Sequence, residues 1–177
     1  MFTRFTPQAR RTVVRAGLLS RDSGRAALDE DMILLALSED WPGRSTGVTP
    51  EAVRAELAEP GAGPGERELL ATLGIDLDEI RRRIPVRRDD PAVWRLRRSR
   101  LRPLNVTLVG PAGDIPLTPR ARKVIEVAMS LGAPATREDL LKGMLADGSN
   151  RSVAILHRLG VDLPRLAGEL GFLRRPA

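Results

Sequence analysis

The side chains with the clearest capacity for chemistry are ten arginines that crowd into residues 81–102. Only two acidic residues accompany them, whereas the rest of the chain has 19 basic and 21 acidic residues, so the formal charge of +6 comes from this one stripe. Arginines beside an aromatic ring can grip nucleic acid phosphates or an acidic partner, and the ring can stack on a base. This candidate patch comprises Arg81, Arg82, Arg83, Arg87, Arg88, Trp94, Arg95, Arg97 and Arg98. A solvated linker explains the same composition nearly as well, so both interpretations stay open.

The chain lacks the residues on which most enzymatic and metal chemistry depends. It has no cysteine and a single histidine, His157, which removes thiolate nucleophiles and most histidine-based metal sites and triads. The Gly-Pro-Ala-Gly run at 110–113 lacks the Lys-Ser/Thr pair with which a phosphate loop holds phosphates and magnesium. We therefore expect no enzymatic activity, no metal and no cofactor.

Composition also predicts the kind of core and the cellular location. Aromatic residues make up 3% of the chain, so the core must be built from aliphatic side chains, which suits helix packing. No apolar run approaches the roughly 18 residues that a membrane helix needs, and the first residues lack the apolar stretch of a signal peptide. We expect a cytoplasmic protein without membrane contact.

Three blocks of sequence occur twice, in the same order. The matched blocks are 6–16 with 118–128, 30–37 with 137–144, and 69–77 with 155–163. One short motif could match by chance, but three in order indicate an internal duplication. The copies differ in length, because the first carries an insert at about 41–64.

Each block has the pattern of a helix. Thr6 and Thr118 are N-caps followed by proline at the first helical position, and Asp29 or Thr136 can cap the helix of the middle block. The last block contains Leu-Gly-(Ile/Val)-Asp-Leu, which predicts one helix ending at glycine and another capped by aspartate. The fold class is therefore predicted to be all-α, with two pseudo-symmetric four-helix repeats packed together.

The domain boundaries follow from the repeats. Repeat one covers 1–84, a basic inter-repeat segment covers 85–113, and repeat two covers 114–177. Within the insert, the run after Thr49 predicts one short extra helix. The β-branched residues at 104–109, followed by a Gly-Pro turn, leave a small β-hairpin as the alternative to an irregular linker, confined to edge strands by prolines.

The paired blocks resemble the Clp N-terminal domain, the double repeat that precedes the AAA+ motor of ClpC-type unfoldases. MFTRFTPQARRTVV and IPLTPRARKVIEVA are similar to the two helix-one signatures of that family. DEDMILLAL and REDLLKGML take the place of its Thr-Glu-His-Ile-Leu-Leu-Gly-Leu, and LLATLGIDL and ILHRLGVDL that of its Val-Leu-x-x-Leu-Gly-Val-x-Leu. The resemblance extends over most of the chain except the insert and the arginine stripe, and no phosphate-loop motif accompanies it.

The resemblance implies a docking domain that binds client proteins, adaptors or phosphorylated arginine. The corresponding threonines are Thr6 and Thr118, and the corresponding carboxylates are Asp31 and Glu138. In such a site a helix N-terminus and a threonine meet the phosphate while a carboxylate pairs with the guanidinium. Arg137 stands where the family has threonine, and it either helps to bind phosphate or occupies the carboxylate. Helix capping alone also explains the presence of these two threonines, without any ligand.

Apolar residues near the two helix starts have two interpretations. Phe2 and Phe5 precede the first cap and Leu117 precedes the second. They can pack into the core as a hydrophobic staple, or they can form an exposed peptide-binding patch.

The leading functional hypothesis is a stand-alone Clp-type binding protein in protein quality control, with clients, Clp components or arginine-phosphorylated proteins as partners. It would serve as adaptor, competitor or sink for a Clp unfoldase. The alternative is a nucleic-acid-associated regulator that uses the stripe at 81–102.

Overall fold

The structure of the protein, a computed structural model, describes residues 2–44, 47–58, 90–99 and 104–171. In chain order its elements are η1 (Phe2–Arg4), α1 (Pro7–Asp22), α2 (Glu30–Ser38), α3 (Pro50–Leu57), η2 (Pro91–Val93), β1 (Arg95–Arg98), β2 (Val106–Gly110), β3 (Gly113–Pro116), α6 (Pro119–Leu131), α7 (Arg137–Leu145), α8 (Arg151–Arg158) and α9 (Leu163–Glu169). The fold is mostly helical, with one small sheet.

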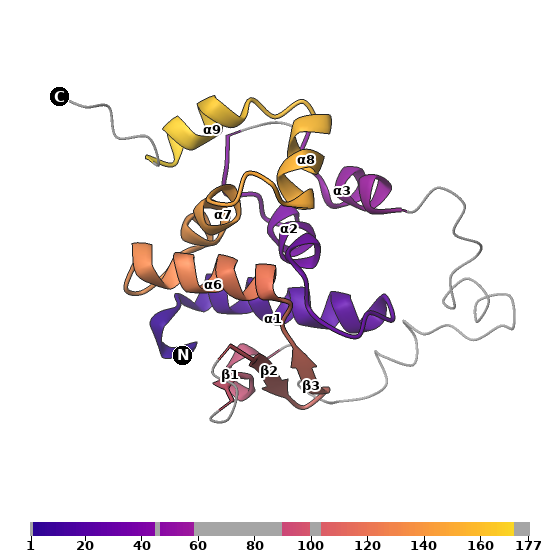
Figure 1. Ribbon diagram of the computed structural model, residues 1–177, viewed down its shortest axis with the longest axis vertical. Helices are drawn as coiled ribbons and strands as arrows, with labels where there is room; N and C mark the ends of the chain where they lie inside the picture. Colours follow the sequence, from indigo (N-terminus) through magenta and orange to yellow (C-terminus); the bar gives the residue numbers. More distant parts are fainter. Residues whose placement is uncertain (1, 45–46, 59–89, 100–103, 172–177) are drawn as a thin grey trace, which may run out of the picture.

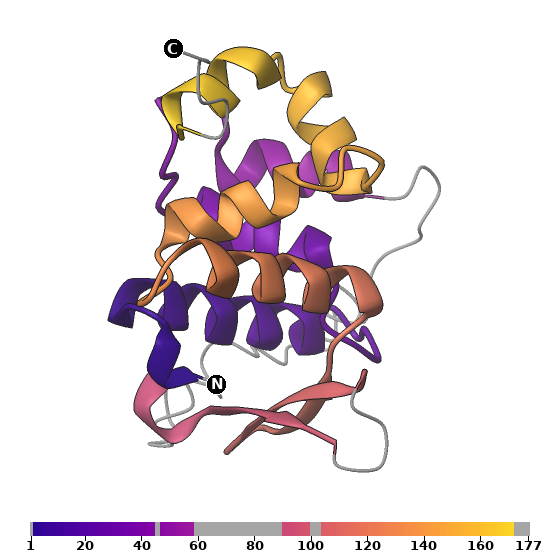
Figure 2. The same cartoon turned by 60° about the vertical axis from the view of Figure 1, so that its left-hand side comes forward.

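The elements are layered along the long axis of the molecule. Figure 1 shows the sheet at one end, beneath α1, and α9 at the opposite end, with α6, α2 and α7 between them. Figure 2 shows the same order after rotation. One apolar cluster runs through these layers and includes side chains from the sheet and from the helices above it.

Threonine–proline pairs start two of the longest helices. Thr6 Oγ1 accepts a hydrogen bond from the N–H of Ala9 at 3.3 Å, and Thr118 Oγ1 accepts one from the N–H of Ala121 at 3.2 Å. The proline after each cap occupies a position whose N–H has no partner within the helix. The helices predicted at both places are confirmed as α1 and α6.

The other predicted caps are also in place. Asp29 caps α2 and Thr136 caps α7. Gly160, with φ of 76°, takes the left-handed conformation after α8, and Asp162 then caps α9. The corresponding block of the first copy, 69–77, lies outside the described residues.

The short helix expected in the insert is confirmed as α3, where Thr49 Oγ1 accepts a hydrogen bond from Ala52. The division into two four-helix repeats, and the domain boundaries drawn from it, stay predictions, because the first copy's last block falls in 59–89, outside the described residues.

The expectation of an all-α fold is wrong in one respect, since β1, β2 and β3 form an antiparallel sheet in that order. The hairpin alternative is confirmed by β2 and β3, which pair through Leu108 and Ile115. The strand β1, inside the arginine stripe, was not predicted. Its Leu96 is buried while Arg95 is exposed, a period-two pattern that the run of charge obscured. Pro116 ends the edge strand β3, where a missing N–H is tolerated.

Two glycines allow close packing between layers. A Cβ on Gly17 would lie 2.5 Å from the Leu108 side chain, so its absence lets the sheet pack against α1. A Cβ on Gly143 would lie 2.4 Å from the carbonyl oxygen of Val124, so its absence lets α7 approach the backbone of α6. These two close contacts fix the positions of α1, α6 and α7, whose N-termini are described below.

Candidate binding surface

The helices α1 and α7 begin side by side. The N–H of Thr6 donates to the carbonyl oxygen of Ala135 at 2.9 Å, and the N–H of Ala135 donates to the carbonyl oxygen of Arg4 at 2.7 Å. This parallel bridge brings together the two residues that cap these helices, Thr6 and Thr136. We call this region the α1/α7 start.

The helices α2 and α6 begin side by side in the same manner. The N–H of Leu28 donates to the carbonyl oxygen of Pro116 at 2.8 Å, and the N–H of Thr118 donates to the carbonyl oxygen of Leu28 at 2.9 Å. The caps Asp29 and Thr118 are therefore neighbours. We call this region the α2/α6 start.

These bridges join each threonine to the acidic helix of the other half of the chain. Thr6 lies beside the helix that carries Glu138, and Thr118 lies beside the helix that carries Asp31. Along the sequence, by contrast, Thr6 is nearer to Asp31 and Thr118 is nearer to Glu138. The threonine of one half of the chain meets the acidic helix of the other half because of long-range backbone hydrogen bonds, for which the sequence gives no signal.

At the α2/α6 start, Asp31 is buried and held by residues of its own chain. It is 5% exposed, and its Oδ1 accepts a hydrogen bond from the Ser152 hydroxyl at 2.9 Å. The Arg151 guanidinium lies 3.7 Å from its other carboxylate oxygen. Ser152 is 121 positions away in sequence, so sequence reasoning missed it. Asp31 therefore links α2 to α8 inside the protein.

The neighbouring acid is also occupied. Glu30 is 6% exposed, and its Oε1 lies 3.4 Å from Nη1 of Arg120, the second residue of α6. Burial raises the pKa of Asp31 above its ordinary value, and the nearby charges of Asp29 and Glu30 add to the rise, although Ser152 and Arg151 oppose it. A guanidinium ligand would have to displace arginines of the protein itself at this start.

At the α1/α7 start, Asp139 completes a capping box with Thr136. Its Oδ2 accepts hydrogen bonds from the N–H of Thr136 at 2.9 Å and from the Thr136 hydroxyl at 3.0 Å. Burial by itself would raise the pKa of Asp139, but the hydrogen bonds from Thr136 and the ion pair with Lys142 outweigh it and lower the pKa. This carboxylate holds the start of α7 together.

The two side chains before Asp139 face different surroundings. Arg137 donates a hydrogen bond to the carbonyl oxygen of Asp40 at 2.8 Å and pairs with the Asp40 carboxylate. It is thus anchored to the end of α2. Glu138 is exposed, and among the described residues it has neither a hydrogen bond nor an ion pair. The carboxylate at the second position of α7 is available to a ligand, in contrast to that of Asp31.

The phenylalanines at the N-terminus belong to the core. Phe2 is 5% exposed and Phe5 is 4% exposed, and their rings meet edge to face with centroids 5.9 Å apart. The Arg10 guanidinium lies over the Phe2 ring and donates to the Phe2 carbonyl oxygen. Leu117 is partly buried against the same core. The packing interpretation holds for both phenylalanines, and neither presents a ring for an exposed peptide-binding patch.

The described part of the arginine stripe is mostly engaged within the protein. Trp94 is 1% exposed and packs over Gly110, so its ring has no face left to stack on a base. Arg97 pairs with Asp114 at 3.3 Å across the sheet. Arg95 and Arg98 are exposed, and Arg98 pairs with Glu126 of α6. The remaining candidates, Arg81, Arg82, Arg83, Arg87 and Arg88, lie outside the described residues.

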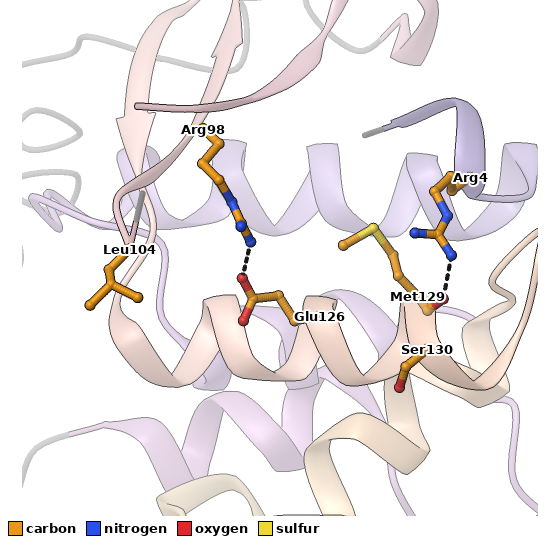
Figure 3. A pocket seen from close by; sticks show the side chains of 6 residues that line it. All are labelled: Arg4, Arg98, Leu104, Glu126, Met129 and Ser130. Atoms are coloured by element: carbon orange, nitrogen blue, oxygen red, sulfur yellow. Dashed lines mark hydrogen bonds and ion pairs between the residues drawn. The ribbon is translucent and has the colours of Figure 1, made fainter. Parts of the chain in front are cut away.

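A groove of about 510 Å³ separates the sheet from α6. Figure 3 shows Arg98 of β1 and Glu126 of α6 pointing toward each other across it, as an ion pair. Arg4 closes one end by donating to the carbonyl oxygen of Met129 at 3.0 Å, and Leu104, 72% exposed, lies at the other. Arg98, Glu126 and Arg4, the charged side chains that line the groove, thus all have partners within the protein.

Two absences hold for the residues that the structure describes. No group of three or more histidine, cysteine, aspartate or glutamate side chains is placed to hold a metal ion there. No helix there is long and apolar enough to cross a membrane.

Comparison with known proteins gives similarities in both sequence and structure. No protein-family model matches the chain. The chain is 26% identical over 177 residues to the "ATP-dependent Clp protease ATP-binding subunit ClpA homolog" of Cyanidium caldarium. The match covers 96% of this chain but 16% of that protein, so the chain spans a small part of its relative's length.

The structural match covers almost the whole of both chains. The fold is similar to the crystal structure of the N-terminal domain of the caseinolytic protease associated chaperone ClpD from Arabidopsis thaliana, with a TM-score of 0.57 and 17% identity. It covers 97% of this chain and 95% of the other.

Proposed function

We propose that this chain is a protein-binding module of a Clp protein quality-control system, because its sequence is similar to a ClpA homolog and its fold to the N-terminal domain of ClpD. It captures clients, adaptors or small ligands that a Clp unfoldase also recognises, and so acts as adaptor, competitor or sink. This role needs a rigid surface with unoccupied binding groups and no catalytic residues.

The observation that carries the proposal is the exposed carboxylate of Glu138 at the α1/α7 start, which has no partner in the part of the chain that the structure describes. Two helix N-termini converge there, and their N–H groups and dipoles favour an anion. A ligand with a phosphate joined to a guanidinium matches this arrangement, because the guanidinium can pair with Glu138 while the phosphate faces the helix starts. Phosphoarginine, free or within a client protein, is the ligand that we propose for this start.

The α2/α6 start is not proposed as a second site of the same kind. Asp31 is occupied by Ser152 and Arg151, and Glu30 by Arg120. A ligand guanidinium would have to replace these contacts and would gain little net free energy.

Isothermal titration calorimetry with free phosphoarginine tests the proposal. We expect weak binding to the unaltered protein and none to Glu138→Ala. The matched control is Glu51→Ala, because Glu51 is exposed at the second position of α3, after the cap Thr49, as Glu138 is in α7. Equal heats from Glu138→Ala and the unaltered protein would remove the site.

A pull-down from a bacterial lysate tests the wider role. The bait is the whole chain, and its Glu138→Ala variant is the comparison. We expect Clp components or arginine-phosphorylated proteins to be recovered, with the phosphorylated ones reduced for the variant. Recovery of neither class would contradict a role in a Clp system.

A further inference from the structure

A cavity of about 410 Å³ lies between α1, the end of α2 and the start of α7. Its floor is apolar, because Val14, Leu18 and Ala36 line it and each is buried against the core. Cavities of about 300–1,000 Å³ with an apolar lining are typical of ligand sites. This one has room for an aliphatic side chain and the peptide backbone beside it.

Guanidinium groups surround the apolar floor. Arg15 makes a bidentate pair with Glu39, through contacts of 2.8 and 2.9 Å. Arg137 is anchored to Asp40 on the other side of the cavity. In each pair the carboxylate compensates the charge of its arginine and holds that side chain on the rim.

Arg11 is the exception on this rim. It is exposed, it lines the cavity, and among the described residues no carboxylate or carbonyl oxygen partners its guanidinium. The cavity therefore has three guanidiniums and two carboxylates, with the excess positive charge at one place. An anionic group bound there would meet an arginine that has no competing partner in the described part of the chain.

We propose that this cavity docks an acidic peptide segment, with an aliphatic side chain on the floor formed by Val14, Leu18 and Ala36 and a neighbouring carboxylate on Arg11. The occupant follows from charge complementarity. An apolar floor takes up an aliphatic side chain, and a single unpaired guanidinium takes up one carboxylate. The inference deepens the proposed function and rests on it only in that the chain binds proteins.

The fixed carboxylates restrict what else could bind. Glu39 and Asp40 on the cavity wall repel a polyphosphate or a nucleic acid backbone, whereas a lone carboxylate can reach Arg11 and stay clear of them. No aromatic ring is among the described residues that line the cavity, so base stacking has no platform there. Glu138 does not line it either, so this site and the α1/α7 start can be tested separately.

Fluorescence anisotropy with a labelled, end-capped peptide that carries one glutamate beside a leucine in an otherwise uncharged sequence tests the proposal. We expect binding that weakens as salt rises, and at least about tenfold weaker binding to Arg11→Glu, because like charges then face each other. Arg11→Gln should give an intermediate loss. The matched control is Arg54→Glu, an exposed arginine on α3 that makes the same change in net charge away from the cavity.

Two peptide controls separate charge from apolar contact. Replacing glutamate with lysine should abolish binding, and replacing leucine with serine should weaken it. Equal affinity of Arg11→Glu and the unaltered protein for the acidic peptide, or equal losses in Arg11→Glu and Arg54→Glu, would overturn the proposal.

Calorimetry with phosphoarginine on Arg11→Glu keeps the two sites apart. We expect its heats to match those of the unaltered protein. If Arg11→Glu loses acidic-peptide binding and keeps phosphoarginine binding, the loss belongs to the cavity. If Glu138→Ala loses phosphoarginine binding and keeps acidic-peptide binding, the loss belongs to the α1/α7 start.

Discussion

The α1/α7 start and the α2/α6 start share one backbone arrangement, but they differ in whether the acidic side chain is paired within the protein. Each joins two helix N-termini through a parallel bridge, and each has an acidic residue at the second position of one helix. That residue is Asp31 in α2 and Glu138 in α7. Asp31 is buried with partners, while Glu138 is exposed without one among the described residues.

The difference originates in the partner helices. The second position of α6 is Arg120, which pairs with Glu30 beside Asp31, whereas the second position of α1 is Gln8, which brings no charge to the start of α7. In addition, α8 places Ser152 against Asp31. The comparison shows that one helix-pair geometry can serve as a structural link or as an open binding group, depending on the side chains that neighbouring helices supply.

The largest expected effect is on stability at the α2/α6 start. Ser152→Ala should lower the free energy of unfolding by about 1–3 kcal/mol at neutral pH, because it leaves the buried Asp31 carboxylate without its hydrogen bond. Urea unfolding followed by circular dichroism measures this. Glu138→Ala should change stability by less than about 0.5 kcal/mol, since it removes an exposed side chain that has no partner among residues 2–44, 47–58, 90–99 and 104–171. Equal losses in the two variants would break the comparison.

Gln8→Arg should make the α1/α7 start resemble its counterpart. The new guanidinium, at the position that Arg120 has in α6, would add positive charge beside the start of α7. It would compete with a ligand guanidinium for Glu138 and should weaken phosphoarginine binding about tenfold, or about 1.4 kcal/mol. The same variant adds positive charge to the rim of the cavity near Arg11 and should strengthen acidic-peptide binding. Gln8→Ala is the control for loss of the amide. Changes of the same sign for both ligands would contradict separate sites.

Asp139→Asn should cost about 1 kcal/mol, because it weakens the capping box with Thr136. The pKa of Asp139 is lowered in the folded state, so its ionised form stabilises the fold above the unfolded pKa, and this stabilisation is lost as pH falls through the folded pKa. The difference between variant and unaltered protein should therefore shrink in acid. Thermal unfolding across a pH series measures it, and a constant difference would count against the assignment.

Asp31→Asn should have the smallest effect and the opposite sign. The pKa of Asp31 is raised, so the fold is favoured while this carboxyl is protonated and loses that advantage as pH rises from the unfolded pKa through the folded one. Asparagine keeps an oxygen for Ser152 and carries no charge, so the variant should be slightly more stable at neutral pH and no different in strong acid. The same pH series tests this, and destabilisation at neutral pH would show that the Arg151 ion pair dominates.

Local signals predicted the helices well. The start of α1 after Thr6, the start of α7 after Thr136 and the turn at Gly160 depend on hydrogen bonds or backbone angles within a few residues, so the sequence contains all the information needed. The sequence also placed the candidate acids Asp31 and Glu138 in the first turns of their helices, where the structure has them. It did not predict their burial or pairing, because Ser152 and Arg120 approach from distant helices.

The strand β1 was missed for a related reason. Its arginines gave the stretch the composition of a charged linker. The pairing with β2 and the burial of Leu96 and Trp94 make it a strand with one buried face. Because Trp94 is buried, the base-stacking role expected for it is not available.

By itself, the amino-acid sequence determined where helices begin and end and which residues stand at their N-termini, because caps, prolines and glycines act over one or two turns. Only the tertiary structure decided which helix starts meet, that Asp31 is buried while Glu138 is open, and that Arg11 borders an apolar cavity. Those outcomes depend on contacts across about a hundred residues or more, whose free energy exists only once the helices have packed.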